Sequence, residues 1–221
     1  MSNQNILAID TCTEVCSVSL YTKGEKISRF IQGMEKSSGL ILPMCDEVFA
    51  EAELLPSDLD AIIYTKGPGS FTGVRVCVGV VQGISLAYDI PTMGFSTLEV
   101  VGFGASKKYN TNKVAVALDA RMNEVYWGVY KDNKLDTEVL KKPNEVDALN
   151  QQFIGVGTGW GAYKDELIKQ TGIAESVADF YPKSENLIDL YLTHVNQDDA
   201  FDDELPLPTY LRNNVAQKSL K

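Results

Sequence analysis

The sequence predicts an α/β fold built from two similar β-β-β-α-β-α lobes. An apolar, strand-like run closes on Asp10, and a second run of the same kind closes on Asp119, about halfway along the 221-residue chain. Tyr21 and Tyr130 lie in the strand-like segment that follows each run, at the same distance from the aspartate. In both halves strand-like segments come first and helical segments follow. The alternative is that two hairpins of one sheet share ordinary strand chemistry.

The first half, residues 1–108, is expected to form one lobe. Strands are predicted where apolar residues run together or alternate with polar ones: 6–9, 15–21, 26–32, 60–65 and a short strand from Pro91. Helices are predicted where apolar residues recur at helical spacing: roughly 37–54, 71–88 and 97–108.

The second half, residues 109–221, is expected to form the other lobe. Its predicted strands are 114–118, 125–130, 135–140 and 153–156, and its predicted helices are 160–170 and 187–194. Residues 205–208, which contain two prolines, should be extended because proline restricts the residue before it.

Composition excludes several classes of function. The 30 acidic residues outnumber the 20 basic ones and give a net charge of -10, which argues against a chain that binds nucleic acid alone or an anionic membrane. The four cysteines form neither a zinc set nor a disulfide framework and are expected as reduced thiols. The N-terminus lacks the basic region of a signal peptide, and segment 74–88 is too short and too polar to span a bilayer. We therefore expect a cytoplasmic protein.

Two glycine-rich loops each join a predicted strand to a predicted helix. In the first, residues 67–73, glycines would let backbone amides approach a phosphate at a helix N-terminus, but Val74 takes the place of the Walker lysine. A capped strand-to-helix turn explains this loop as well. In the second, which holds Gly155 and Gly157, Trp160 stands where a dinucleotide motif has its third glycine. A tight strand–helix turn is equally compatible with it.

The predicted helix 71–88 is apolar nearly all round, which is typical of a helix covered on both sides. It contains Gly79 and Gly83, and each glycine costs a helix interior about 1 kcal/mol relative to alanine. Two glycines four residues apart suggest a close helix–helix crossing. That crossing could lie inside its own lobe, or one face, together with the apolar side of helix 37–54, could form a partner interface.

Few residues could carry catalysis. His194 is the only histidine and is expected to be structural, so the chain cannot provide a metal-binding histidine pair. Ser70 lacks the flanking glycines of a nucleophile elbow. Asp10 and Asp119 could face each other across a cleft and hold Mg²⁺ with a nucleotide, which gives one hypothesis for function: a nucleotide-dependent enzyme, an ATPase or kinase.

Four segments, in their order and spacing, resemble the TsaB (YeaZ) family of bacteria. They are ILAIDTCTEVCSV (6–18), GPGSFTGVR (67–75), DARMNEVYW (119–127) and YLRNNV (210–215), and residues 156–160 fit as well. The resemblance extends from about residue 5 to residue 218 and implies the actin-like/Hsp70-like/sugar-kinase fold, in agreement with the two predicted lobes.

The resemblance also implies a function. Such a chain is a non-catalytic scaffold that binds TsaD, a catalytic paralogue that transfers a threonylcarbamoyl group to adenosine 37 of tRNAs reading ANN codons. A small ATPase, TsaE, joins the assembly. We therefore expect no cofactor in this chain, ATP or ADP and a metal ion in its partner subunits, contact with tRNA only through the complex, and no membrane partner. Without the paralogue, a homodimer through the same face is expected.

The family's partner contact corresponds here to helices 37–54 and 71–88. The interface candidates are Leu40, Met44, Val48, Phe71, Val74, Arg75, Val78, Gly79, Gln82 and Gly83. The candidates for a degenerate nucleotide site are Asp10, Thr11, Asp119, Gly155 and Gly157. Substitution of Gly79 by Leu or of Val78 by Asp is expected to disrupt partner binding and to leave the fold largely intact. Ser37 stands where family members commonly have histidine, so local contacts should differ there.

Overall fold

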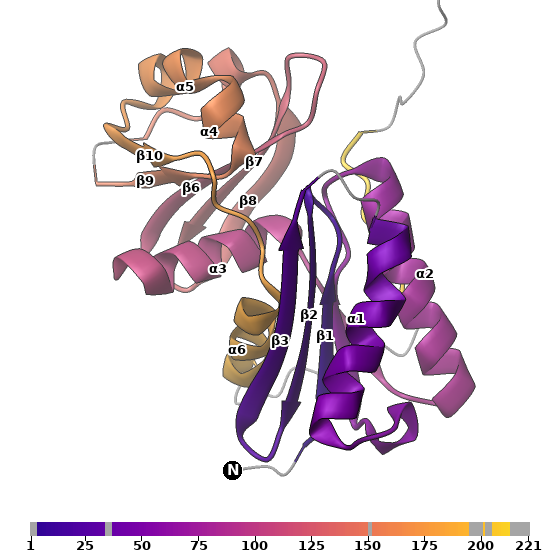
Figure 1. The fold of residues 1–221 in the computed structure, drawn as a ribbon. Coiled ribbons are helices and arrows are strands. Elements are labelled where there is room, and N and C mark those ends of the chain that lie inside the picture. The colour runs from indigo at the N-terminus through magenta and orange to yellow at the C-terminus, as the bar shows by residue number, and fades with distance from the viewer. Residues whose placement is uncertain (1–3, 34–36, 150–151, 195–200, 202–204, 213–221) are drawn as a thin grey trace, which may run out of the picture.

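The computed structural model describes residues 4–33, 37–149, 152–194, 201 and 205–212, which form two five-stranded sheets flanked by helices (Figure 1). The first sheet has the order β3-β2-β1-β4-β5, with β1 (Ile6–Asp10), β2 (Val15–Thr22), β3 (Glu25–Gln32), β4 (Ala61–Thr65) and β5 (Thr92–Phe95). The second has the order β10-β9-β6-β7-β8, with β6 (Lys113–Asp119), β7 (Val125–Lys131), β8 (Lys134–Lys141), β9 (Ile154–Val156) and β10 (Glu175–Val177). The predicted α/β class is confirmed, although β10 was not predicted.

The two sheets repeat one topology. β1 is antiparallel to β2 and parallel to β4, and β6 is antiparallel to β7 and parallel to β9. Asp10 and Asp119 are the last residues of the equivalent strands β1 and β6. The second repeat also departs from the prediction between its third and fourth strands. In its described residues between β8 and β9 there is only a 3-10 turn, η2 (Pro143–Glu145), where the first repeat has an α-helix.

The α-helices follow the predicted segments closely. They are α1 (Ser37–Ala52), α2 (Phe71–Tyr88), α3 (Thr97–Tyr109), α4 (Thr158–Ala162), α5 (Lys164–Thr171) and α6 (Ser184–His194), with a 3-10 turn η1 (Pro56–Asp58) after α1. The predicted helix 160–170 is two helices, because the backbone of Tyr163, with φ of -133°, is not helical. Ser70 caps the N-terminus of α2, where its side chain accepts from the backbone N–H of Gly73, and Asp89, in the left-handed conformation, caps the C-terminus.

Helices α3 and α6 each pack on the sheet that the other half of the sequence forms. α1 and α2 pack on one face of the first sheet, and α6 covers its other face with Leu187, Ile188 and Tyr191. α3, from the first half of the sequence, contributes Leu98 and Val101 to the core beneath the second sheet. The helices α3 and α6 also touch each other, so they form the layer between the two sheets (Figure 1). α4 and α5 cover the far face of the second sheet.

A buried hydroxyl network fixes α6 on the first sheet. The Oγ atom of Ser184, at the first residue of α6, lies 2.7 Å from Oγ of both Ser17 and Ser19 on β2. The backbone N–H of Ser184 also donates to Ser17 Oγ at 3.0 Å. Three buried hydroxyls thus satisfy each other, which removes the desolvation penalty that an unpaired hydroxyl would carry.

Candidate functional site: the interlobe pocket and the α2 surface

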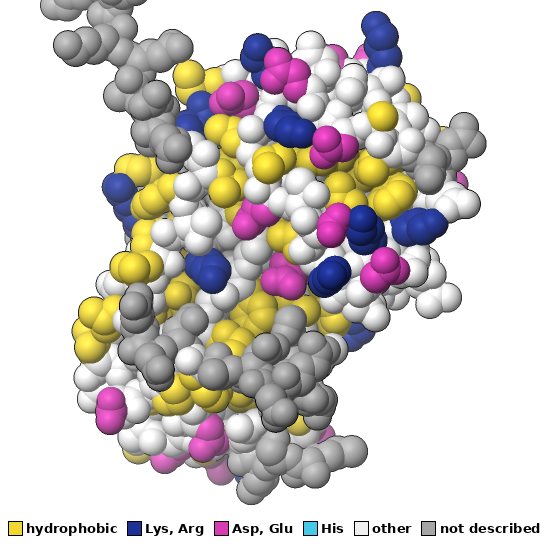
Figure 2. Space-filling view, turned by 180° about the vertical axis from the view of Figure 1, so that it is seen from behind, with side chains coloured by type: hydrophobic (Ala, Val, Ile, Leu, Met, Phe, Trp, Pro, Cys, Tyr) yellow, Lys and Arg dark blue, Asp and Glu magenta, His cyan; other side chains and the backbone are white. Residues whose placement is uncertain are grey.

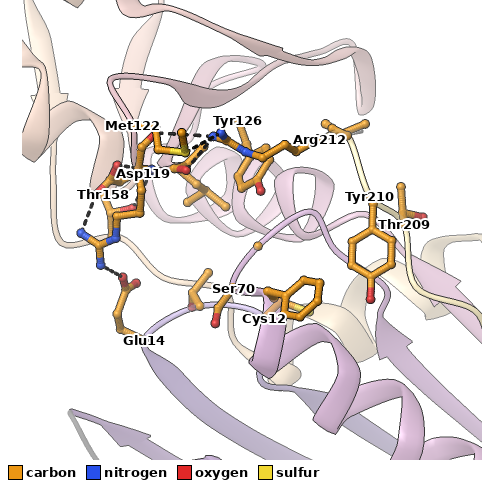
Figure 3. A pocket seen from close by; sticks show the side chains of 17 residues that line it. Cys12, Glu14, Ser70, Asp119, Met122, Tyr126, Thr158, Thr209, Tyr210 and Arg212 are labelled. Carbon is orange, nitrogen blue, oxygen red and sulfur yellow. Dashed lines mark hydrogen bonds and ion pairs between the residues drawn. The ribbon is translucent and has the colours of Figure 1, made fainter. Parts of the chain in front are cut away.

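A pocket of about 420 Å³ lies between the lobes, where β1 and β6 end and α2 begins (Figure 3). Both lobes and the C-terminal segment line it, with Cys12 and Ser70 from the first lobe, Asp119 and Tyr126 from the second, and Tyr210 and Arg212 from the segment. This is the place where the sequence predicted a cleft. Of the predicted nucleotide-site residues, only Asp119 lines it.

The N-terminus of α2 is filled by the loop between β1 and β2. The backbone N–H of Ser70 donates to the carbonyl oxygen of Cys12 at 2.7 Å, and Thr11 Oγ1 donates to the carbonyl oxygen of Gly73 at 2.7 Å. A Cβ on Gly69 would lie 2.0 Å from the carbonyl oxygen of Cys12, and a Cβ on Gly73 would lie 2.0 Å from that of Thr11. Only glycine therefore fits at either position. Carbonyl oxygens, which carry partial negative charge, therefore lie where a phosphate would need donors. The glycine-rich loop before α2 serves as a capped turn.

Asp10 is buried inside the first lobe and does not line the pocket. Its Oδ1 accepts from Thr65 Oγ1 and, at 3.3 Å, from the backbone N–H of Cys12, while Oδ2 has no hydrogen-bond partner among the described residues. Burial raises the pKa of Asp10 to about 6, and the two hydrogen bonds oppose that shift. Thr11 is buried as well. Asp10 and Asp119 therefore do not face each other across the pocket, as a shared Mg²⁺ would require.

The charge of Asp119 is paired within the protein. Arg121 donates to its carboxylate twice at 2.8 Å, from the backbone N–H to Oδ1 and from Nη1 to Oδ2, and Tyr163 Oη donates to Oδ1 at 3.3 Å. Nη2 of Arg121 also lies 3.3 Å from Glu14 Oε1 of the first lobe (Figure 3). Asp119 thus anchors a charged contact between the lobes.

Gly155 and Gly157 serve the packing of the second lobe. A Cβ on Gly155 would lie 2.4 Å from the ring of Trp160. Gly157 has a φ of +105°, and a Cβ there would lie 2.6 Å from the carbonyl oxygen of Ala117. The second glycine-rich loop is therefore a tight strand–helix turn.

The interface candidates fall into two groups. Met44, Val48, Val74 and Val78 pack in the core between the helices and the first sheet, so their side chains provide no contact surface in this fold. Leu40 and Gln82 are partly exposed, and Phe71, Arg75, Gly79 and Gly83 are exposed. In the space-filling view, hydrophobic side chains line the left edge, where α2 lies (Figure 2).

α2 has an unusual apolar character for a surface helix. In the described part of the chain it alone has the length and hydropathy of a membrane-crossing helix. Its valines nevertheless pack on the first sheet, and its Arg75 and Gln82 side chains contact the C-terminal segment. Its exposed side carries Phe71 and Leu86, which are 45% and 66% exposed. The side chains of His194 and Ser37 lie outside the described part of the structure.

Residues 205–212, which we call the C-terminal strap, run beside α2 and reach the second lobe. Gln82 Nε2 donates to the carbonyl oxygen of Pro206 at 2.7 Å, and Arg75 Nε donates to Tyr210 Oη at 2.9 Å. At the far end, Arg212 Nη2 lies 2.6 Å from Glu124 Oε2 of the second lobe. The sequence predicted an extended segment but not its contacts. The signal was present in Arg75 and Gln82, two long polar side chains on a mostly apolar helix.

Comparison with known proteins places the chain in a family. A family model described as TsaD, tRNA N6-adenosine threonylcarbamoyltransferase, matches residues 33–219. The chain is 38% identical over 226 residues to the tRNA threonylcarbamoyladenosine biosynthesis protein TsaB of Escherichia coli (strain K12), with 97% of each chain covered. The chain belongs to the TsaB family.

Further relatives of the TsaB family agree with this. TsaB of Haemophilus influenzae is 32% identical over 235 residues, which covers 100% of this chain and 98% of the relative. The solved structure of YeaZ from Pseudomonas aeruginosa is 34% identical, has a TM-score of 0.84, and covers 94% of this chain and 100% of that chain. The fold is of the actin-like/Hsp70-like/sugar-kinase type, as the resemblance implied.

The residues that surround the interlobe pocket of this TsaB-family chain do not fit the phosphates of a nucleotide. The backbone N–H of Ser70 already donates to the carbonyl oxygen of Cys12, that of Gly73 donates to Ser70 Oγ, and Asp10 is enclosed in the core. The carboxylate of Asp119 is held by Arg121. Each charged side chain that lines the pocket forms an ion pair: Glu14 and Asp119 with Arg121, and Arg212 with Glu124.

Proposed function

We propose that this TsaB-family chain is the non-catalytic scaffold subunit of tRNA threonylcarbamoylation. In this role it binds a TsaD-like transferase that modifies adenosine 37 of tRNAs reading ANN codons. The observation that carries the proposal is the exposed side of α2, where a Cβ added at Gly79 or Gly83 would meet no atom of a described neighbouring residue within 4 Å. Two glycines on an exposed, apolar helix face let a second helix approach closely, which is what a docking surface requires.

The interlobe pocket supports the non-catalytic half of this proposal. The carbonyl oxygens of Thr11 and Cys12 lie beside the start of α2, where a bound phosphate would need hydrogen-bond donors. We therefore assign ATP or ADP and the metal ion to the partner subunits, TsaD-like and TsaE-like. The net charge of -10 supports tRNA contact through the complex and not through this chain alone. We further propose a cytoplasmic location, and a homodimer through the α1–α2 face when the paralogue is absent.

A reconstituted modification reaction tests the proposal. Purified TsaD-like and TsaE-like proteins of the same organism, with the enzyme that makes threonylcarbamoyl-adenylate, are given tRNA with and without this chain. We expect threonylcarbamoyladenosine to form only when the chain is present. Gly79→Leu should abolish the stimulation, while the matched control Gly79→Ala should retain it. Full product formation without the chain would overturn the proposal.

A nucleotide-dependent enzyme of the same fold is the second candidate. The observation that favours it is the pocket of about 420 Å³ at the interlobe position, with Asp119 in its wall. Calorimetry with Mg-ATP on the isolated chain separates the two hypotheses. Sub-millimolar binding together with turnover would favour the enzyme, and heats no larger than those of dilution would favour the scaffold.

A further inference from the structure

The C-terminal strap is fixed to α2 and to the second lobe at several points. Besides the bonds from Gln82 and Arg75, the backbone N–H of Thr209 donates to the carbonyl oxygen of Lys66 at 2.7 Å, just after β4. The ring of Tyr210 lies 6.0 Å from that of Phe71, and the guanidinium of Arg75 lies 3.5 Å from the Phe71 ring centroid. These contacts hold the strap in a defined position on the surface of α2.

The strap is held with an apolar side outward. In an extended segment successive side chains point to opposite sides. Pro206 is buried against the protein, while Leu205 and Leu207 on either side of it are 53% and 60% exposed. A strap needed only to tie the lobes together could carry polar residues at these outward positions. Two outward leucines add apolar surface beside a helix that already exposes Phe71 and Leu86.

The helix geometry places the strap at one side of the glycine pair. At about 100° per residue, Arg75 and Gln82 lie within about 20° of each other on α2, and both contact the strap. Gly79 and Gly83 lie about 40° and 80° further round the helix than Arg75. Beyond them, Val76, Val80 and Ile84 pack on the core that α1 shares with the sheet. Gly79 and Gly83 therefore form the open centre of an exposed helix face, which we call the floor, and the strap lies along one side of this face.

The character of this face fits a protein helix better than a lipid surface. The floor lacks side chains, so a rigid helix can approach closely, whereas a membrane gains most from protruding apolar groups. The exposed side of α1 carries Asp46, Glu47 and Glu51, and the chain has a net charge of -10, which disfavours an anionic bilayer. The TsaD family model spans α1, α2 and the strap, so a TsaD-like chain has equivalent segments to offer in return.

We propose that the C-terminal strap is part of the partner-docking surface, with Leu205 and Leu207 packing against an apolar helix of the TsaD-like paralogue that lies over Gly79 and Gly83. This inference rests on the proposed function and extends it. Arg75 and Gln82 act in docking through the strap, because their polar groups position it.

Binding measurements on the full-length chain test the strap separately from α2. The double variant Leu205→Ser/Leu207→Ser replaces two side chains that are more than half exposed, so its thermal unfolding should stay close to that of the wild type. We expect its dissociation constant for the paralogue to rise about tenfold or more, since leucines that are buried on docking lose their contacts. Ile31→Ser, on the edge strand β3 and 38% exposed, is the matched control and should bind as the wild type does. Gly79→Leu should abolish binding.

Each other outcome has a distinct meaning. If the strap variant binds normally while Gly79→Leu does not, the strap inference is wrong and the scaffold proposal stands. If neither variant changes binding, both the strap inference and the α2 docking face are wrong. If the strap variant loses only self-association, or only binding to vesicles of phosphatidylglycerol and phosphatidylcholine, the assigned occupant is wrong. A second copy of the chain, or a lipid surface, would then be the occupant.

Discussion

Burial of Asp10 predicts a specific dependence of stability on pH. The folded state holds the pKa of Asp10 at about 6, above the ordinary value of 3.8, because burial penalises the charged carboxylate. The neutral form is therefore favoured in the folded state. The contribution of the protonated Asp10 carboxyl to the free energy of unfolding is fully present below about pH 4 and is lost as the pH rises through 6. The complete loss is about 3 kcal/mol, from roughly two pKa units at 1.36 kcal/mol each.

Substitution of Asp10 by Asn measures this effect. Asn keeps an oxygen for the Thr65 donor and removes the titrating group, while its unpartnered amide lowers stability equally at every pH. Between about pH 5 and pH 8 the wild type should lose roughly 1.4 kcal/mol more than Asp10→Asn, by linkage with these pKa values.

Urea unfolding at several pH values provides the assay. In a chain that keeps Asp10, Thr65→Val should enlarge the loss of stability at high pH, because the Thr65 hydrogen bond lowers the pKa of Asp10. Thr65→Ser keeps the hydroxyl and should not enlarge it. A constant difference between the wild type and Asp10→Asn across this range would show that Asp10 titrates with an ordinary pKa and would refute the reasoning.

Four further substitutions test the packing and the anchoring of the strap. Gly73→Ala should destabilise the fold by about 2 kcal/mol or more, because a Cβ there meets a backbone carbonyl at 2.0 Å, whereas Gly79→Ala should stabilise it by up to about 1 kcal/mol, both measured by urea unfolding. Val78→Asp should lower the melting temperature strongly, by an amount corresponding to about 3 kcal/mol or more, since the side chain is 4% exposed; unchanged melting would contradict its core position. Arg212→Ala removes the 2.6 Å ion pair with Glu124 and should speed amide exchange in the strap, and exchange at the wild-type rate would show that the pair does not hold it.

The glycines of α2 show what the sequence could predict. Gly79 and Gly83 stood out as an unfavourable choice inside an apolar helix, and the structure leaves open space beside both. Val78 stood out by the same periodicity, yet it is buried, so the substitution Val78→Asp is no test of docking. Periodicity identifies an apolar helix, but a helix that is apolar nearly all round does not reveal which side faces the sheet.

Long-range contacts set the limit of prediction elsewhere. Asp10 and Asp119 end equivalent strands, which the sequence predicted, but one is enclosed and the other is paired with Arg121. That difference depends on how the β1–β2 loop packs against the start of α2. Likewise the segments of α3 and α6 were predicted as helices, while their crossing between sheets depends on contacts such as Ser184 with β2.

Light scattering on the chain alone and mixed with its organism's TsaD-like protein tests the central claim most directly. A scaffold subunit should give one species that contains both chains and is heavier than either alone. Gly79→Ala should form the same species, and Gly79→Leu should not. If the wild type and the paralogue keep their separate masses when mixed at concentrations well above the micromolar range, this chain is not the scaffold of that transferase.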